Sequence, residues 1–155
     1  MKTPRGWHSR GFLPHYDGGS IIQFITCRLY DSLPRKILDG FRAELQENRA
    51  EDIDRKVMIL VEKFLDSGYG ECFLKQREVA EIVRDALQKF DGERYKLIAW
   101  VIMPNHIHLL FKPLNNWELA KILQSFKSFT ASEANKVLKR KGEFWMREYF
   151  DRYIR

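Results

Sequence analysis

Two histidines stand two residues apart in the segment Pro104-Asn105-His106-Ile107-His108, directly after a turn signal and at the start of an apolar run. In a β-strand successive side chains alternate between the two faces, so His106 and His108 would project from one face and Ile107 from the other. Two neutral imidazoles on one rigid face are suited to bind a divalent ion, provided that other groups complete its shell. His106 and His108 are therefore candidate metal ligands.

Taken alone, a His-x-His pair is a weak indication of a metal, because histidines at this spacing are more often structural or solvent-facing. The surrounding pattern strengthens it. Residues 95–103 and 106–112 are two apolar strand patterns joined by a very short turn, which predicts an antiparallel hairpin at the centre of a sheet. A buried imidazole there would need its own hydrogen-bond partners, and a bound metal would satisfy both rings at once.

The periodicity of apolar residues predicts the other elements. A strand is expected within 20–29, helices over 34–48, 52–66 and 76–90, a long helix from 117 to about 140, and a tail that begins as a short strand at 144. The first nineteen residues are expected to form an irregular arm with basic and aromatic tips. This order predicts an α+β, ferredoxin-like βαββαβ fold with an antiparallel sheet, in which residues 34–70 are a helical insertion after the first strand.

Length and composition limit the possible classes of protein. A chain of 155 residues suits a single domain over 1–155 with one site. The net charge of +6, from 27 basic and 21 acidic residues, favours an anionic partner, nucleic acid first, although ordinary solvated surfaces give this balance about as often.

The cysteines and the hydropathy pattern indicate the compartment. Cys27 and Cys72 lack zinc-ligand spacing and are predicted to be buried thiols of a cytoplasmic protein. No stretch has the length of a membrane span, and the chain does not start with a secretory signal, so no membrane partner is expected.

Basic and phenolic side chains late in the chain are weaker candidates. Lys127, in the middle of the long helix between Phe126 and Phe129, is the best placed of several lysines to contact a phosphate backbone. Tyr149 and Tyr153 offer phenols, but packing or base stacking outweighs catalysis as an explanation for either.

Five blocks of the chain together resemble the REP-associated tyrosine transposases, members of the HUH single-strand transposases. The blocks are RGWHSRGFLPH (5–15), QFITCRL (23–29), AWVIMPNHIH (99–108), FKSFT (126–130) and FWMREYFDRYIR (144–155). The block that holds the two histidines is specific, and its combination with the terminal aromatic-basic block is much more so.

The resemblance implies a mechanism. His106 and His108 would hold Mg²⁺ or Mn²⁺, which would act on the scissile phosphate of single-stranded or hairpin DNA. A tyrosine would attack, leaving a covalent 5′-phosphotyrosine and a free 3′-hydroxyl for later rejoining. DNA contacts are expected from basic residues of the matching blocks, namely Arg10, Arg28, Lys127, Arg147, Arg152 and Arg155.

The sequence departs from the family at the nucleophile. In the relatives the catalytic tyrosine lies on a helix after the aromatic-basic block, whereas this sequence ends at Arg155. The chain is expected to be either part of a longer enzyme, with the nucleophile beyond Arg155, or a truncated copy that binds DNA without cleaving it. Tyr149 and Tyr153 match the preceding block, and neither is assigned the catalytic role.

Two other functions stay open. One is a nonenzymatic protein that binds single-stranded or hairpin DNA. The other is a metal-dependent hydrolase. It ranks well below the first, because no Asp or Glu stands at a spacing from the histidines that would indicate a third ligand. Whether one subunit or a homodimer builds the site is also left open.

Overall fold

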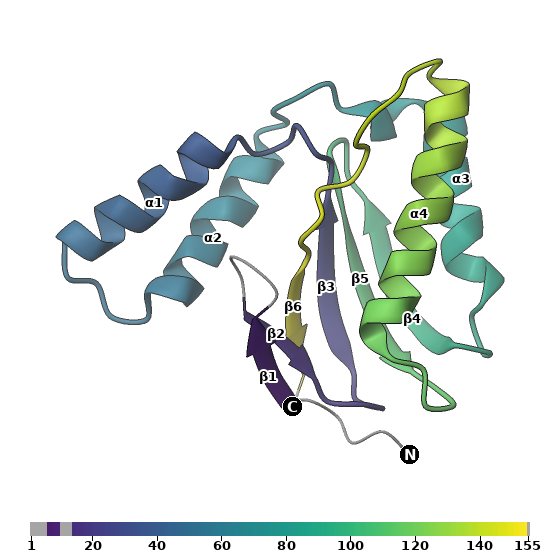
Figure 1. Cartoon of the computed structure of the whole chain (residues 1–155), viewed down its shortest axis with the longest axis horizontal. Helices are drawn as coiled ribbons and strands as arrows, with labels where there is room; N and C mark the ends of the chain where they lie inside the picture. The colour runs from purple at the N-terminus through teal and green to yellow at the C-terminus, as the bar shows by residue number, and fades with distance from the viewer. Residues whose placement is uncertain (1–5, 10–13, 155) are drawn as a thin grey trace.

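The computed structural model describes residues 6–9 and 14–154 of the chain. Figure 1 shows the arrangement of the helices and strands. In chain order they are β1 (Gly6–Ser9), β2 (Pro14–Asp17), β3 (Gln23–Arg28), α1 (Arg35–Glu47), α2 (Ile53–Asp66), the short 3-10 helix η1 (Phe73–Lys75), α3 (Arg77–Lys89), β4 (Tyr95–Ile102), β5 (His106–Pro113), α4 (Leu119–Val137) and β6 (Phe150–Tyr153).

Four strands form an antiparallel sheet in the order β4-β5-β3-β6. The hairpin of β4 and β5 is the one expected from the sequence, and its second strand, β5, occupies a central position. Helix α3 precedes β4 and helix α4 connects β5 to β6, which gives the ferredoxin-like βαββαβ order. The predicted α+β class with an antiparallel sheet is confirmed.

The main core lies between this sheet and helices α3 and α4. On β5, Ile107, Leu109 and Phe111 alternate with the histidines and are almost fully buried. They pack with apolar residues at helical spacing on the two helices, which are Val79, Val83, Leu87, Ile122, Leu123 and Phe126. Since one face of β5 supplies this core, the histidines face the other side of the sheet.

A second, smaller core belongs to the pair of helices inserted after β3. Val57, Val61 and Leu65 form one buried row along α2 and pack with Leu38 of α1 and Phe150 of β6. The helices expected over 34–48 and 52–66 are therefore present, and the insertion is anchored to the sheet through its edge strand β6 (Figure 1).

Two sequence-based expectations are wrong in part. Within the arm, β1 and β2 pair as an antiparallel ribbon with Trp7 opposite Tyr16, so the arm is not irregular over these segments. The tail does not begin as a strand: an isolated antiparallel bridge between Trp145 and Leu29 stands where the strand was expected, and Phe144 and Trp145 are buried in the main core. The strand of the tail is β6, at its end.

Both cysteines are free and buried, as predicted. Burial raises the pKa of the Cys27 thiol to about 11. Among the described residues, no helix combines the length and the apolar character that crossing a membrane requires.

Candidate metal centre

The two histidine rings converge on one point beside the sheet. Their Nε2 atoms are 3.2 Å apart, and the ring planes meet at 78°. Two nitrogens bound to the same ion at about 2.1 Å lie roughly 3 Å from each other. The pair therefore has the spacing of two ligands of one metal ion.

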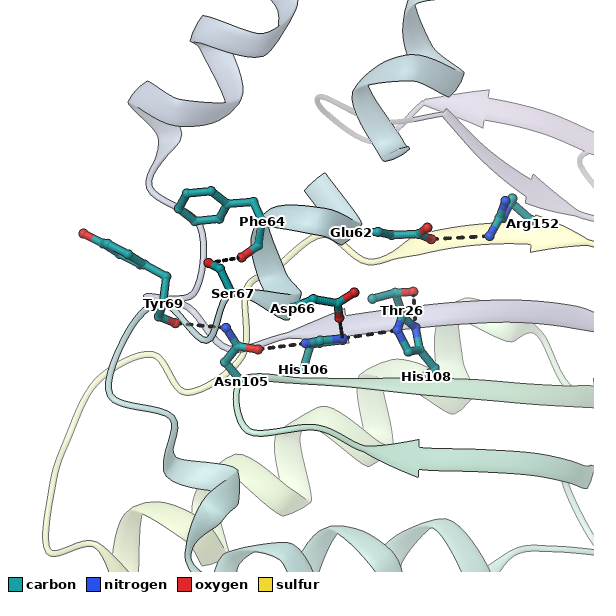
Figure 2. A network of polar contacts seen from close by, with 10 residues as sticks. All are labelled: Thr26, Glu62, Phe64, Asp66, Ser67, Tyr69, Asn105, His106, His108 and Arg152. Atoms are coloured by element: carbon teal, nitrogen blue, oxygen red, sulfur yellow. Dashed lines mark hydrogen bonds and ion pairs between the residues drawn. The ribbon is translucent and has the colours of Figure 1, made fainter. Parts of the chain in front are cut away.

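A hydrogen-bond chain fixes the protonation of His106. The Nδ2 group of Asn105 donates to the Tyr69 carbonyl over 2.9 Å, so the amide oxygen of Asn105 faces His106 Nδ1 at 2.8 Å (Figure 2). Because that oxygen only accepts, Nδ1 carries the proton and Nε2 keeps its lone pair. Partners of this kind behind a metal-binding histidine orient the ring and set its tautomer.

His108 is held in the same manner from the neighbouring strand. Thr26 lies opposite it in the pairing of β3 with β5, and Thr26 Oγ1 is 2.8 Å from His108 Nδ1. The ring of Phe24 stacks on the other side of the imidazole, with 5.1 Å between centroids. Both rings thus use Nδ1 for support and direct Nε2 to the shared point.

Burial keeps both imidazoles neutral. It is the main cause that lowers the pKa of His106 to about 4, and the neighbouring His108 adds to this while the Asp66 carboxylate opposes it. Burial also lowers the pKa of His108, against the carboxylates of Glu62 and Asp66. Neutral imidazole is the form that binds metals, so the pair is ready for a cation at neutral pH.

Helix α2 brings two carboxylates to this side of the sheet. Asp66 Oδ1 lies 3.7 Å from His106 Nε2, and Glu62, one turn earlier, forms a 3.3 Å ion pair with Arg152. Within residues 6–9 and 14–154, no three His, Cys, Asp or Glu side chains are arranged as a complete metal-binding cluster. The two imidazoles are thus the ligands that the described chain offers, with acidic groups nearby.

Sequence reasoning missed the residues that support the histidines. The sequence predicts a turn at Asn105 and a strand at Thr26, and neither pattern indicates a contact with a histidine. Asp66 is distant in sequence, and no periodic signal links it to His106. Only the register between β3 and β5, which places Thr26 opposite His108, could have been inferred from strand alternation.

Of the basic residues expected to contact DNA, Arg152 lies beside the histidine pair. Its side chain is 54% exposed, and its guanidinium sits over the Phe24 ring at 5.3 Å. Arg10 and Arg155 lie outside the described residues.

Of the other three, Arg147 is exposed within the segment that leads from α4 to β6, and Arg28 and Lys127 contact that segment. Arg28 is 3% exposed, donates to the Leu33 carbonyl over 3.4 Å, and burial lowers its pKa to about 10. The Lys127 ammonium donates to the backbone carbonyls of Met146 and Arg147, which ties α4 to that segment. Contact with DNA stays a prediction for these residues.

Three of the tyrosines whose side chains the structure describes are engaged elsewhere. Tyr149 is buried in the main core. Tyr95 donates to the Leu87 carbonyl, and burial raises its pKa to about 12. Tyr69 lends the site its carbonyl, while its ring packs on Phe64 and points away from the histidines (Figure 2).

Comparison with known families shows the family of this chain. Residues 71–153, more than half of the chain, match the family described as IS200-like transposases, and they include both histidines. The chain belongs to the IS200-like transposase family. This confirms the transposase family indicated by the sequence.

Two solved structures are similar to this chain at low identity. One is a REP-associated tyrosine transposase bound to a REP hairpin, with 13% identity, a TM-score of 0.48, and 96% of this chain aligned to 62% of that one. The other is a Deinococcus radiodurans protein described as a transposase, with 13% identity, a TM-score of 0.46, and 96% of this chain aligned to 85% of it. None of the curated proteins matches the chain.

Proposed function

We propose that this chain carries the metal-binding half of a transposase active site that nicks and rejoins single-stranded DNA. The observation that supports it most is the convergence of His106 Nε2 and His108 Nε2 to 3.2 Å, with each Nδ1 held from behind. Both histidines lie within the region matched to the transposase family.

The residues have distinct roles in this proposal. His106 and His108 hold Mg²⁺ or Mn²⁺, and Asn105 and Thr26 keep the rings oriented. When bound, the ion withdraws electron density from the scissile phosphate. A tyrosine oxygen would form a bond to phosphorus as its proton passes to solvent. The bond from phosphorus to the 3′-oxygen would break, and that oxygen would take a proton from solvent and leave as the 3′-hydroxyl. Rejoining is the reverse.

The nucleophile is expected outside residues 1–155. Among the described tyrosines whose side chains are placed, none has a recorded hydroxyl contact with either histidine. Tyr149 and Tyr153 have no catalytic role in the proposal, because they match the block that precedes the tyrosine helix in the family.

The DNA strand is proposed to cross the histidine face of the sheet. Phe24, stacked on His108, offers a ring for a base, and the exposed Arg152 beside it offers a charge for a phosphate. The bound partner would be single-stranded or hairpin DNA. Contacts from Arg10, Arg147 and Arg155 to the same DNA are also proposed, on the family resemblance alone.

A second copy of the chain is proposed to pair along β4. This strand is an edge of the sheet and exposes Ile98, Trp100 and Val101, and exposed apolar edges are prone to pair with another strand. Val101 lies opposite His108, so a dimer would bring two sites onto one continuous sheet. Sedimentation should show a dimer that Val101→Lys disrupts, and an unchanged mass for that variant would exclude this edge.

Calorimetric titration with Mn²⁺ tests the metal proposal. Binding is expected at micromolar or weaker affinity and should be abolished in the double variant His106→Ala and His108→Ala. Unchanged binding in that variant would contradict the proposal. A longer protein that includes a C-terminal tyrosine helix should then form a covalent adduct with hairpin DNA.

The alternative is a nonenzymatic protein that binds single-stranded or hairpin DNA. This alternative predicts that DNA binding survives chelation of the metal and that no covalent adduct forms even in the longer protein.

A further inference from the structure

The inserted helix α2 reaches the histidine pair although it lies outside the part of the chain that matches the transposase family, residues 71–153. Its last residue, Asp66, places Oδ1 3.7 Å from His106 Nε2. This distance is too long for a hydrogen bond. The carboxylate therefore faces the metal-binding side of the imidazole across a gap rather than capping it.

The packing of α2 fixes which side chains reach the sheet. Val61 and Leu65 are buried in the smaller core, while Glu62 and Asp66, four residues apart, lie on one side of the helix. Glu62 is already paired with Arg152. In the described part of the chain, the polar contact recorded for the Asp66 side chain is the one to His106.

Asp66 does not stabilise helix α2 at this position. It is the final residue of α2, where the negative end of the helix dipole disfavours a carboxylate. The turn that follows is well held, because Ser67 Oγ donates to the Phe64 carbonyl over 2.6 Å and the Tyr69 carbonyl accepts from Asn105 (Figure 2). The same turn thus connects Asp66 and the residue that orients His106.

We propose that Asp66 is a positioning residue of the metal centre, whose carboxylate holds a water molecule bound to the ion. This rests on the proposed function. Binding of Asp66 to a metal-bound water, and not to the ion itself, fits the described residues, among which no third side chain completes a cluster of direct ligands. Mg²⁺ and related hard ions keep several waters in protein sites, and those waters need acceptors. The insertion would then contribute to ion affinity and not only to stability.

Calorimetric titration of Mn²⁺ into the full chain tests this. Asp66→Asn should weaken binding about tenfold, the usual cost of losing a group that supports a metal shell. Asp54→Asn is the matched control, because Asp54 is on the same helix, carries the same charge and is similarly exposed, at 59% against 62%. It lies roughly 18 Å away along the helix, a distance at which salt at physiological ionic strength screens its charge. The control should bind as the native chain does.

Proton relaxation of water in the presence of bound Mn²⁺ provides a second measurement. Asp66→Asn should alter the exchange of metal-bound water, which a merely structural role would not change, while thermal unfolding confirms that the variant is folded. Asp66→Glu, which keeps the charge, should restore part of the affinity.

The possible outcomes separate this inference from the proposed function. If Asp66→Asn binds Mn²⁺ as the native chain does, while the double histidine variant loses binding, Asp66 has no role and the histidine site stands. Equal weakening in Asp66→Asn and Asp54→Asn would reduce the effect to overall charge and overturn the inference. If the native chain binds no Mn²⁺, both fail.

Discussion

The two faces of the sheet are built in opposite ways. On the face covered by α3 and α4, β5 contributes Ile107, Leu109 and Phe111 to a continuous apolar core. On the other face, the same strand contributes two histidines, each held at Nδ1 by a partner from β3 or from the turn before β5, with their Nε2 atoms facing each other. One strand therefore supplies stability to one side and chemistry to the other.

The side chains on the two faces are held in position by different interactions. Apolar burial is non-directional, whereas a metal pair needs its nitrogens held within a fraction of an ångström by hydrogen bonds. The covered face supplies the rigid strand, and Asn105 and Thr26 fix the rings on it. Mutations on the two faces should consequently separate stability from metal affinity.

The largest effect is expected for Ile107→Ala, on the covered face between the two histidines. Ile107 is fully buried, and removing a buried aliphatic side chain of this size costs about 2 to 5 kcal/mol of unfolding free energy. Urea unfolding measures it. Leu110→Ala, on the partly exposed histidine face of the same strand, is the control and should cost clearly less. Equal losses would mean that the two faces do not differ in their contribution to stability.

The next effect is a dependence of stability on pH that arises on the histidine face. In the unfolded chain the His106 imidazole takes up a proton as the pH falls below 6.5, whereas in the folded chain it stays neutral until about 4. The unfolded state binds more protons in this window, so the unfolding free energy of the metal-free protein should fall with falling pH, by up to about 3 kcal/mol.

His106→Gln isolates this contribution, because glutamine does not titrate. Thermal or urea unfolding measures both proteins from pH 6.5 down to about 4. Over this range the unfolding free energy of the native chain should fall more than that of the variant. A difference that stays constant over this window would show that His106 titrates normally in the folded protein.

The two faces also differ in how far the sequence predicts them. Strand alternation placed Ile107 in the core and the histidines opposite it, and helical spacing placed Val83 and Leu87 on the covering helix. These are local patterns with fixed periods, so they need no knowledge of the fold.

The supporting residues of the histidine face could not be found in this way. Asp66 reaches His106 only because α2 packs on β6 through Phe150, and Asn105 is oriented by a backbone carbonyl, that of Tyr69. Contacts of this kind depend on tertiary packing and leave no periodic trace. Phe144 and Trp145 are likewise buried by tertiary packing. Aromatic residues are common in strands, so this segment was wrongly predicted to be one.

Asn105→Ala should have a smaller effect, on both the stability of the fold and the affinity for the metal. It leaves the Tyr69 carbonyl without its recorded donor and His106 Nδ1 without its acceptor. The expected cost is about 1 to 3 kcal/mol in unfolding free energy and roughly tenfold in Mn²⁺ affinity. Asn115→Ala, which removes an exposed amide bonded to the Glu93 carbonyl, is the control and should leave metal affinity unchanged. A loss of stability without a loss of affinity would mean that Asn105 supports only the fold.

The smallest effect is expected for Arg152→Ala, which tests whether the histidine face carries the DNA. Removing one phosphate contact should weaken binding of a single-stranded hairpin roughly fivefold and reduce the slope of log affinity against log salt by about 0.7 to 1. Arg84→Ala removes the same charge from α3 on the covered side of the sheet, where Arg84 pairs with Asp85, and should leave both quantities unchanged. Because the two variants have the same net charge, any difference between them reports position alone. Equal effects would mean that DNA does not distinguish the two faces, and the proposed path of the strand across Phe24 and Arg152 would have to be abandoned.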